Sequence, residues 1–188
     1  MSRWGNSIPG AVAAALVVTV TGCGSHSDGP PTADSPQASS TRLAPAPTAF
    51  DPCSIPQSVL DTEQLHSRIS ANSDGSGGTQ WRGCQWVVSD GYAASIRTTN
   101  ITLQMIRENR AFTVAEELTI GGRPALTYHD NDEPDTKHIC ILNVDLKGGS
   151  VEFSLDNPAS NRKTGNMDTC ELGKNLAGKV VPLIPASA

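Results

Sequence analysis

Near the middle of the chain, the stretch that decides the fold reads Cys84-Gln85-Trp86-Val87-Val88-Ser89-Asp90-Gly91-Tyr92-Ala93-Ala94-Ser95-Ile96-Arg97. Val, Ile, Trp and Tyr favour β-strands, and the intervening Ser89-Asp90-Gly91 is typical of a hairpin turn. Two strand-like runs on either side of one turn predict a pair of antiparallel strands.

Two more hairpins are predicted on the C-terminal side of this stretch. One joins residues 117–120 to residues 124–128 through Gly121-Gly122, and the other joins residues 139–146 to residues 151–155. Apolar residues alternate along 139–146, as they do in a strand with one buried face. Three hairpins in one chain indicate an antiparallel sheet.

Helices are expected before, within and after this sheet. The run from Ser54 to Ile69 is predicted to be helical, with Asp61 and Gln64 as a capping box that restarts the helix. A short helix is expected within residues 101–110, because its apolar residues are near helical spacing. The Gly- and Ser-rich residues 72–79 are expected to form a mobile loop.

The last helix has the strongest signal. Asp168 is its predicted N-cap, Glu171 completes a capping box, and Leu172, Leu176, Val180 and Ile184 are spaced by four residues. Pro182 is expected to end the helix before Ile184. The elements together predict an α+β domain over residues 50–188, an antiparallel sheet with helices packed mainly on one face and with helices at the N- and C-terminal ends.

The N-terminus has the pattern of a secretory signal peptide over residues 1–22. Arg3 is followed by a charge-free stretch with an apolar centre at residues 11–20, which is short for a membrane-spanning helix. Val20-Thr21-Gly22-Cys23 resembles the bacterial lipobox. It predicts cleavage between Gly22 and Cys23, a diacylglyceryl lipid on Cys23, and anchoring at the extracytoplasmic face of the cell membrane.

Residues 23–49 contain little that could be buried, being rich in Ser, Pro, Thr and Ala. Such a segment is expected to be a disordered, lipidated tether. Cleavage after Gly22 would remove only Arg3 from the 14 Lys and Arg, which leaves 13 against 19 Asp and Glu and a net charge of −6. An acidic chain of this kind is a poor partner for nucleic acid.

Four cysteines remain after Cys23 is assigned to lipid, and an even number in an exported chain implies disulfides. Three pairings are possible. We favour Cys53–Cys84 with Cys140–Cys170, because each pair closes a loop of about 30 residues and would join one helix to one strand.

Few residues qualify as site candidates. Trp81 lies beside the Gly-rich segment and could form a binding surface. The chain has no G-x-S-x-G elbow, and the acidic run 129–135 lacks the Gly and the distal Glu of an EF-hand loop. We therefore assign no catalytic residue, no metal and no cofactor. A pocket that joined His66 or His138 to a Ser and an Asp would favour an enzyme instead.

The whole chain resembles a family of actinobacterial cell-envelope lipoproteins whose domain has no assigned function, of which the mycobacterial LprB and LprC are similar examples. The features that carry the resemblance are the lipobox, the tether, Phe50-Asp51-Pro52-Cys53, Gly83-Cys84-Gln85-Trp86, Gly121-Gly122-Arg123-Pro124-Ala125-Leu126, Cys140 and Cys170. The resemblance implies an envelope location and a domain suspected of binding a ligand or partner. It supplies no catalytic residues.

Two functions of different classes follow. The first is a tethered binding or interaction module, whose partner is an envelope protein, a glycan or a small ligand. The alternative is a hydrolase-like envelope enzyme with a site assembled from scattered residues. A lipid carrier ranks below both, because a domain of this size has little volume for a large cavity.

Overall fold

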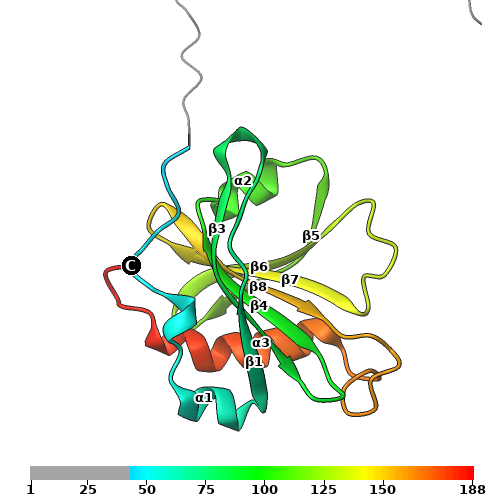
Figure 1. Cartoon of the computed structure of the whole chain (residues 1–188). Coiled ribbons are helices and arrows are strands. Elements are labelled where there is room, and N and C mark those ends of the chain that lie inside the picture. Colours follow the sequence, from blue (N-terminus) through cyan, green and yellow to red (C-terminus); the bar gives the residue numbers. More distant parts are fainter. Residues whose placement is uncertain (1–42) are drawn as a thin grey trace, which may run out of the picture. The chain divides into compact units, whose positions relative to one another are not determined.

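The computed structural model describes residues 43–188, which form an eight-stranded antiparallel sheet with three α-helices and two disulfides (Figure 1). The strand order is β1-β3-β4-β8-β7-β6-β5, and β2 also pairs with β3. The strands are β1 (Leu65–Ser70), β2 (Ser73–Asp74), β3 (Gln80–Val88), β4 (Ala93–Thr99), β5 (Phe112–Ile120), β6 (Arg123–Asp130), β7 (Ile139–Leu146) and β8 (Gly149–Asp156).

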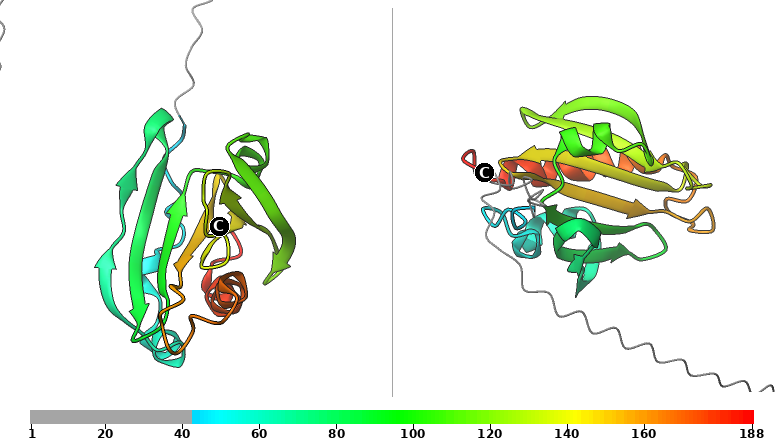
Figure 2. Two further views of the ribbon diagram at one scale, coloured as in Figure 1. Left: turned by 90° about the vertical axis from the view of Figure 1, so that its right-hand side faces the viewer. Right: turned by 90° about the horizontal axis from the view of Figure 1, so that it is seen from above.

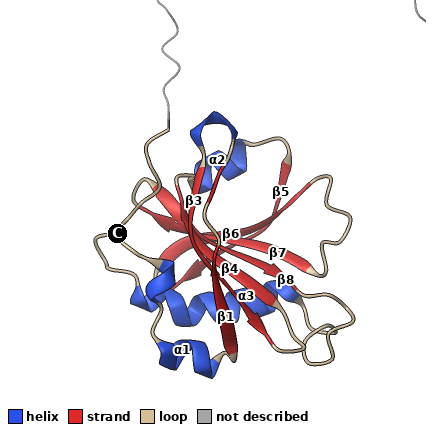
Figure 3. Cartoon of the chain, in the orientation of Figure 1, coloured by secondary structure: helices blue, strands red, loops and turns tan. Residues whose placement is uncertain are grey.

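Three α-helices and three 3-10 helices complete the described part of the chain (Figure 3). The α-helices are α1 (Gln57–Thr62), α2 (Leu103–Glu108) and α3 (Thr169–Val180). The 3-10 helices are η1 (Pro52–Ser54), η2 (Ser76–Gly78) and η3 (Val181–Leu183).

All three predicted hairpins are present, as β3–β4, β5–β6 and β7–β8. Gly121 and Gly122 have φ of 56° and 82° in the β5–β6 turn, a backbone that glycine adopts at little cost. Asp90 takes the same left-handed conformation, with φ of 58°, between β3 and β4. The predicted α+β class and antiparallel sheet are confirmed.

The core is divided into two clusters. Phe153 of β8 and Leu176 of α3 are fully buried in the larger cluster, which also contains Leu60 of α1. Ile106 of α2 packs instead with Tyr128 of β6 in a second, smaller cluster. Figure 2 shows that the sheet is strongly curved and that α3 lies on its inner side, where α3 contacts β7, β8 and β5.

The final helix is as predicted. The Asp168 side chain accepts a hydrogen bond from the Glu171 backbone N–H at 2.9 Å, which caps the first turn. Leu172, Leu176 and Val180 are buried along one face. Ile184 lies beyond the helix, after the turn that contains Pro182, and is also buried.

The prediction of a helix up to Ile69 is wrong. Helix α1 ends at Thr62, and Gln64 takes a left-handed conformation with φ of 57°, so the chain turns and enters edge strand β1. Asp61 does not cap a second helix, because none follows before β1; its carboxylate accepts a hydrogen bond from the Gln57 amide at 2.7 Å. A left-handed residue directly after a helix is a common way for a helix to end.

Two neighbouring segments also carry more structure than expected. Residues 72–79, predicted to be a mobile loop, contain β2 and η2. The last residues of the predicted tether contact the domain: the Asn100 amide donates to the Ala44 carbonyl at 2.7 Å, and the Ala46 N–H donates to the Gln80 side chain at 3.1 Å. The chain therefore lies along the domain before η1 begins.

Candidate functional site

The two predicted disulfides are both present, and each joins a helix to a strand. Cys53 of η1 pairs with Cys84 of β3, with the Cα atoms 5.2 Å apart. Cys140 of β7 pairs with Cys170 of α3, with the Cα atoms 5.1 Å apart. The first disulfide brings together two segments that are 31 residues apart in sequence.

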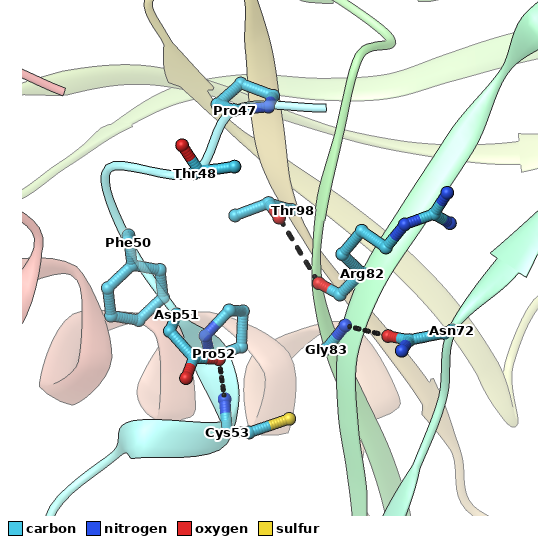
Figure 4. A pocket seen from close by; sticks show the side chains of 10 residues that line it. All are labelled: Pro47, Thr48, Phe50, Asp51, Pro52, Cys53, Asn72, Arg82, Gly83 and Thr98. Carbon is cyan, nitrogen blue, oxygen red and sulfur yellow. Dashed lines mark hydrogen bonds between the residues drawn. The ribbon is translucent and has the colours of Figure 1, made fainter. Parts of the chain in front are cut away.

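A surface pocket of about 350 Å³ lies where these two segments meet (Figure 4). One wall is formed by residues 47–53, which lead into η1. The other is formed by Asn72 before β2 and by Arg82, Gly83 and Thr98 of the paired strands β3 and β4.

Local hydrogen bonds shape the wall of residues 47–53. The Asp51 carboxylate accepts from the Cys53 N–H at 2.9 Å and from the Ser54 hydroxyl at 2.6 Å, which caps η1. Pro52 occupies the start of η1, where a missing N–H is tolerated. Phe50 is buried against the core. The wall thus presents the rings of Phe50 and Pro52 in a fixed arrangement.

The opposite wall is held by side chains that are already engaged elsewhere. The Arg82 guanidinium donates to the Ser73 carbonyl at 2.8 Å and to the Asp74 carboxylate at 2.6 Å. Figure 4 shows this guanidinium directed away from Phe50 and Pro52, so that the aliphatic part of Arg82 faces the pocket. The pocket therefore has less charge than its residue types suggest.

Asn72 and Gly83 define the polar side of the pocket. The Gly83 N–H donates to the Asn72 side-chain oxygen at 2.8 Å, and this bond fixes the orientation of the amide. The amide nitrogen of Asn72 makes no hydrogen bond to another described residue, so it can donate to a ligand. Glycine is needed at position 83, because a Cβ there would lie 2.1 Å from the Ile96 carbonyl oxygen.

The pocket is suited to binding. Its proline and phenylalanine rings, the stem of Arg82 and the methyl group of Thr98 form an apolar lining, with the Asn72 amide as a donor. Concave sites that are mostly apolar and have a few fixed polar groups are typical of ligand binding. The lining contains no pair of nucleophile and base.

Trp81 lies outside this pocket. Its indole N–H donates to the Glu152 carboxylate at 2.9 Å, and the Arg97 guanidinium, which pairs with the same carboxylate, lies 5.7 Å from the centre of the Trp81 ring. Asn72, Arg82 and Phe50 were not predicted from the sequence to be binding residues. The sequence feature that could have located this pocket is the predicted Cys53–Cys84 pairing, because it places residues 50–53 beside Gly83.

The histidines that could act as bases do not form a triad in the described residues. His66 contacts the Ser89 hydroxyl through Nε2 at 2.6 Å and the Ser67 hydroxyl through Nδ1 at 2.8 Å, with no carboxylate on its ring. His138 contacts the Asp135 carboxylate at 2.8 Å. Hydrogen bonds from the His138 side chain and backbone lower the pKa of Asp135. Within residues 43–188, no group of three His, Cys, Asp or Glu could hold a metal ion.

Fold and site define a small α+β domain with two disulfides and a shallow, largely apolar surface pocket. A family model described as "Protein of unknown function (DUF3558)" matches residues 18–183, and the chain belongs to this family. No curated protein and no solved structure is significantly similar to the chain.

The membrane-related predictions lie mostly outside the described residues. Gly22 and Cys23, the predicted cleavage and lipidation sites, both precede residue 43. None of the helices in residues 43–188 is both long and apolar enough to cross a membrane.

Proposed function

We propose that this protein is an extracytoplasmic lipoprotein of the actinobacterial cell envelope, held on the membrane by a lipid on Cys23, and that its domain is a binding module. The observation that carries the binding function is the pocket beside the Cys53–Cys84 disulfide, with its apolar walls and its fixed Asn72 amide. Two disulfides suit a chain that works in an oxidising compartment. The signal peptide and lipobox support the membrane anchor, as does the resemblance to LprB and LprC.

The tether sets how far the pocket can lie from the membrane. Residues 24–42 separate Cys23 from the first described residue, Leu43. The proposed disordered tether would span about 25 Å from end to end, as expected for a flexible chain of this length. The pocket wall begins at Pro47, so the pocket would work within a few nanometres of the bilayer surface.

A hydrolase-like envelope enzyme is the second candidate. The short contact between His66 and Ser89 supports it, but no described carboxylate orients the imidazole as in a catalytic triad. A lipid carrier is third, because the pocket volume of about 350 Å³ corresponds to only about a dozen water molecules.

Two measurements test the proposed function. Mass spectrometry of the mature protein should find an N-terminal Cys23 that carries a diacylglyceryl group, and Cys23→Ala should release the protein from membranes.

A photo-crosslinking residue at exposed Thr48 should capture a defined ligand or partner in cells, whereas the same residue at exposed Lys137, which does not line the pocket, should not. Asn72→Leu should abolish the adduct. Absence of a Thr48 adduct, or its persistence with Asn72→Leu, would argue against binding at this pocket.

A further inference from the structure

A second hollow, separate from the pocket of Figure 4, lies between α1 and edge strand β1. Its volume is about 230 Å³. Four apolar side chains that are each at least 90% buried line it, namely Ile55, Leu60, Leu65 and Trp86. The remaining lining residues are polar or charged, namely Gln57, His66, Ser67 and Arg68.

A neighbouring hollow of about 290 Å³ lies beside this one. The two share Leu65 and His66, and the second adds Ser89 and Lys163. Neither hollow alone reaches the usual size of a ligand site, but the two together do. One small molecule could therefore lie along both, beside the His66 ring.

A buried hydrogen-bond donor in this region lacks a partner. Trp86 is only 1% exposed, and its indole N–H has no acceptor within the described residues. Such buried unpartnered groups are rare in folded proteins and call for a specific explanation. Trp86 also lines the hollow, so a ligand bound there would change the surroundings of this indole N–H.

Two cations flank His66 without a carboxylate partner among the described residues. The Arg68 guanidinium donates to the Cys53 carbonyl at 2.9 Å, and the Lys163 ammonium donates to the Gln64 side-chain oxygen at 3.2 Å. Asp61 is the one carboxylate that lines either hollow, and it accepts a hydrogen bond from Gln57 at 2.7 Å. The available groups are thus mainly donors and positive charges, although the chain as a whole has a net charge of −5.

The backbone of β1 is irregular at the same place. Ser67 has φ of 58°, and the register with β3 shifts between His66 and Ile69. Left-handed residues other than glycine, and bulges, are frequent next to functional sites. The irregular strand places the Ser67 and Ser89 hydroxyls on the two ring nitrogens of His66, which fixes the imidazole between the two hollows.

We propose that the two neighbouring hollows together bind one small organic carboxylate. The apolar body of the ligand lies on Ile55, Leu60 and Leu65, and its carboxylate is directed to the donors around His66, namely Arg68 and Lys163. A planar guanidinium matches a carboxylate well, because two N–H groups can donate to its two oxygens. The apolar body occupies the smaller hollow, which has room for roughly eight water volumes, and the carboxylate extends towards the second hollow, so we expect an anion of about six to ten non-hydrogen atoms.

The test is a titration of the ¹⁵N-labelled full chain with 4-methylpentanoate, followed by NMR. The neutral 4-methylpentanamide has the same shape without the charge and serves as the control ligand. We expect the carboxylate to shift the Trp86 indole N–H resonance in a saturable way. The amide should bind about tenfold more weakly or worse, as expected for the loss of charge-assisted hydrogen bonds.

Two variants locate the carboxylate. Arg68→Gln and Lys163→Gln should each weaken binding by about tenfold, whereas Arg82→Gln, at the pocket of Figure 4, should leave it unchanged. Lys163 is exposed, so Lys163→Gln decides the question if Arg68→Gln fails to fold. No saturable shift at Trp86, equal binding of the amide, or binding unaffected by both variants would overturn the proposal.

Discussion

Gln64 occupies a position that normally suits glycine, directly after the end of α1, with φ of 57°. A residue other than glycine costs about 1–2 kcal/mol in this conformation, so replacing Gln64 by glycine relieves that strain. Part of the stability gained is offset, because glycine also makes the unfolded chain more flexible. We expect Gln64→Gly to raise the free energy of unfolding by about 0.5–1 kcal/mol in chemical denaturation. Gln57→Gly, at the first residue of α1, should lower it, because it removes the hydrogen bond from the Gln57 amide to Asp61. A lower stability for Gln64→Gly would contradict this account.

Trp81 illustrates how a candidate binding residue can have a structural role. Glu152 is only 4% exposed, and its carboxylate accepts from the Trp81 indole and from Arg97. Trp81→Phe removes one of these donors from a buried acceptor, which costs about 1–3 kcal/mol of stability. Urea denaturation of the variant measures this loss. A stability equal to that of the wild type would argue against this structural role and favour a role of Trp81 in surface binding.

At the scale of elements, an ion pair links α2 to β5. Arg107 donates through Nε and Nη2 to the two carboxylate oxygens of Glu117, each at 2.8 Å. The hydrogen bond from Arg107 lowers the pKa of Glu117, and the pairing raises the pKa of Arg107. The pair therefore stabilises the fold above the ordinary pKa of a glutamate, and this contribution is lost as the pH falls through the lowered pKa.

Arg107→Gln should consequently raise the pKa of Glu117 towards its ordinary value, as followed by an NMR titration of its carboxyl carbon. The stability difference between wild type and variant should be present at neutral pH and should disappear as the pH falls through the lowered pKa of Glu117. Lys147→Gln, at an exposed lysine in the β7–β8 turn, is the matched control and should leave Glu117 unchanged. A pKa of Glu117 that stays low without Arg107 would refute the pairing.

The hairpins and α3 were predictable because their signals are local. The Gly121-Gly122 turn and the Asp168 cap each act within a few residues. Strand β1 gave no such signal: only Leu65 is buried along it, because it is an edge strand that departs from regular pairing with β3. The Figure 4 pocket depends on residues 47–53, Asn72 and β3, which are distant in sequence. The predicted Cys53–Cys84 disulfide indicates that residues 47–53 meet β3, but it could not show that a cavity lies between them.

For the whole molecule, the two disulfides are a natural comparison, since their sequence separations of 31 and 30 residues are nearly equal. The loop-entropy model assigns about 3.5 kcal/mol to each, so replacement of either cystine by two serines should lower the free energy of unfolding by a similar amount. Denaturation of the two double variants under identical conditions tests this. A difference of several kcal/mol would mean that native packing, and not loop closure, sets their contributions.

Equal stability losses would not mean equal functional losses, because the disulfides hold different parts of the molecule. Cys53–Cys84 ties a wall of the Figure 4 pocket to β3, whereas Cys140–Cys170 ties α3 to β7 on the inner side of the sheet. Under conditions where both double variants remain folded, Cys53→Ser with Cys84→Ser should therefore lose the Thr48 photo-adduct, and Cys140→Ser with Cys170→Ser should retain it. Equal loss of the adduct in both folded variants would indicate that binding depends on the rigidity of the whole domain, since the second disulfide does not touch the pocket.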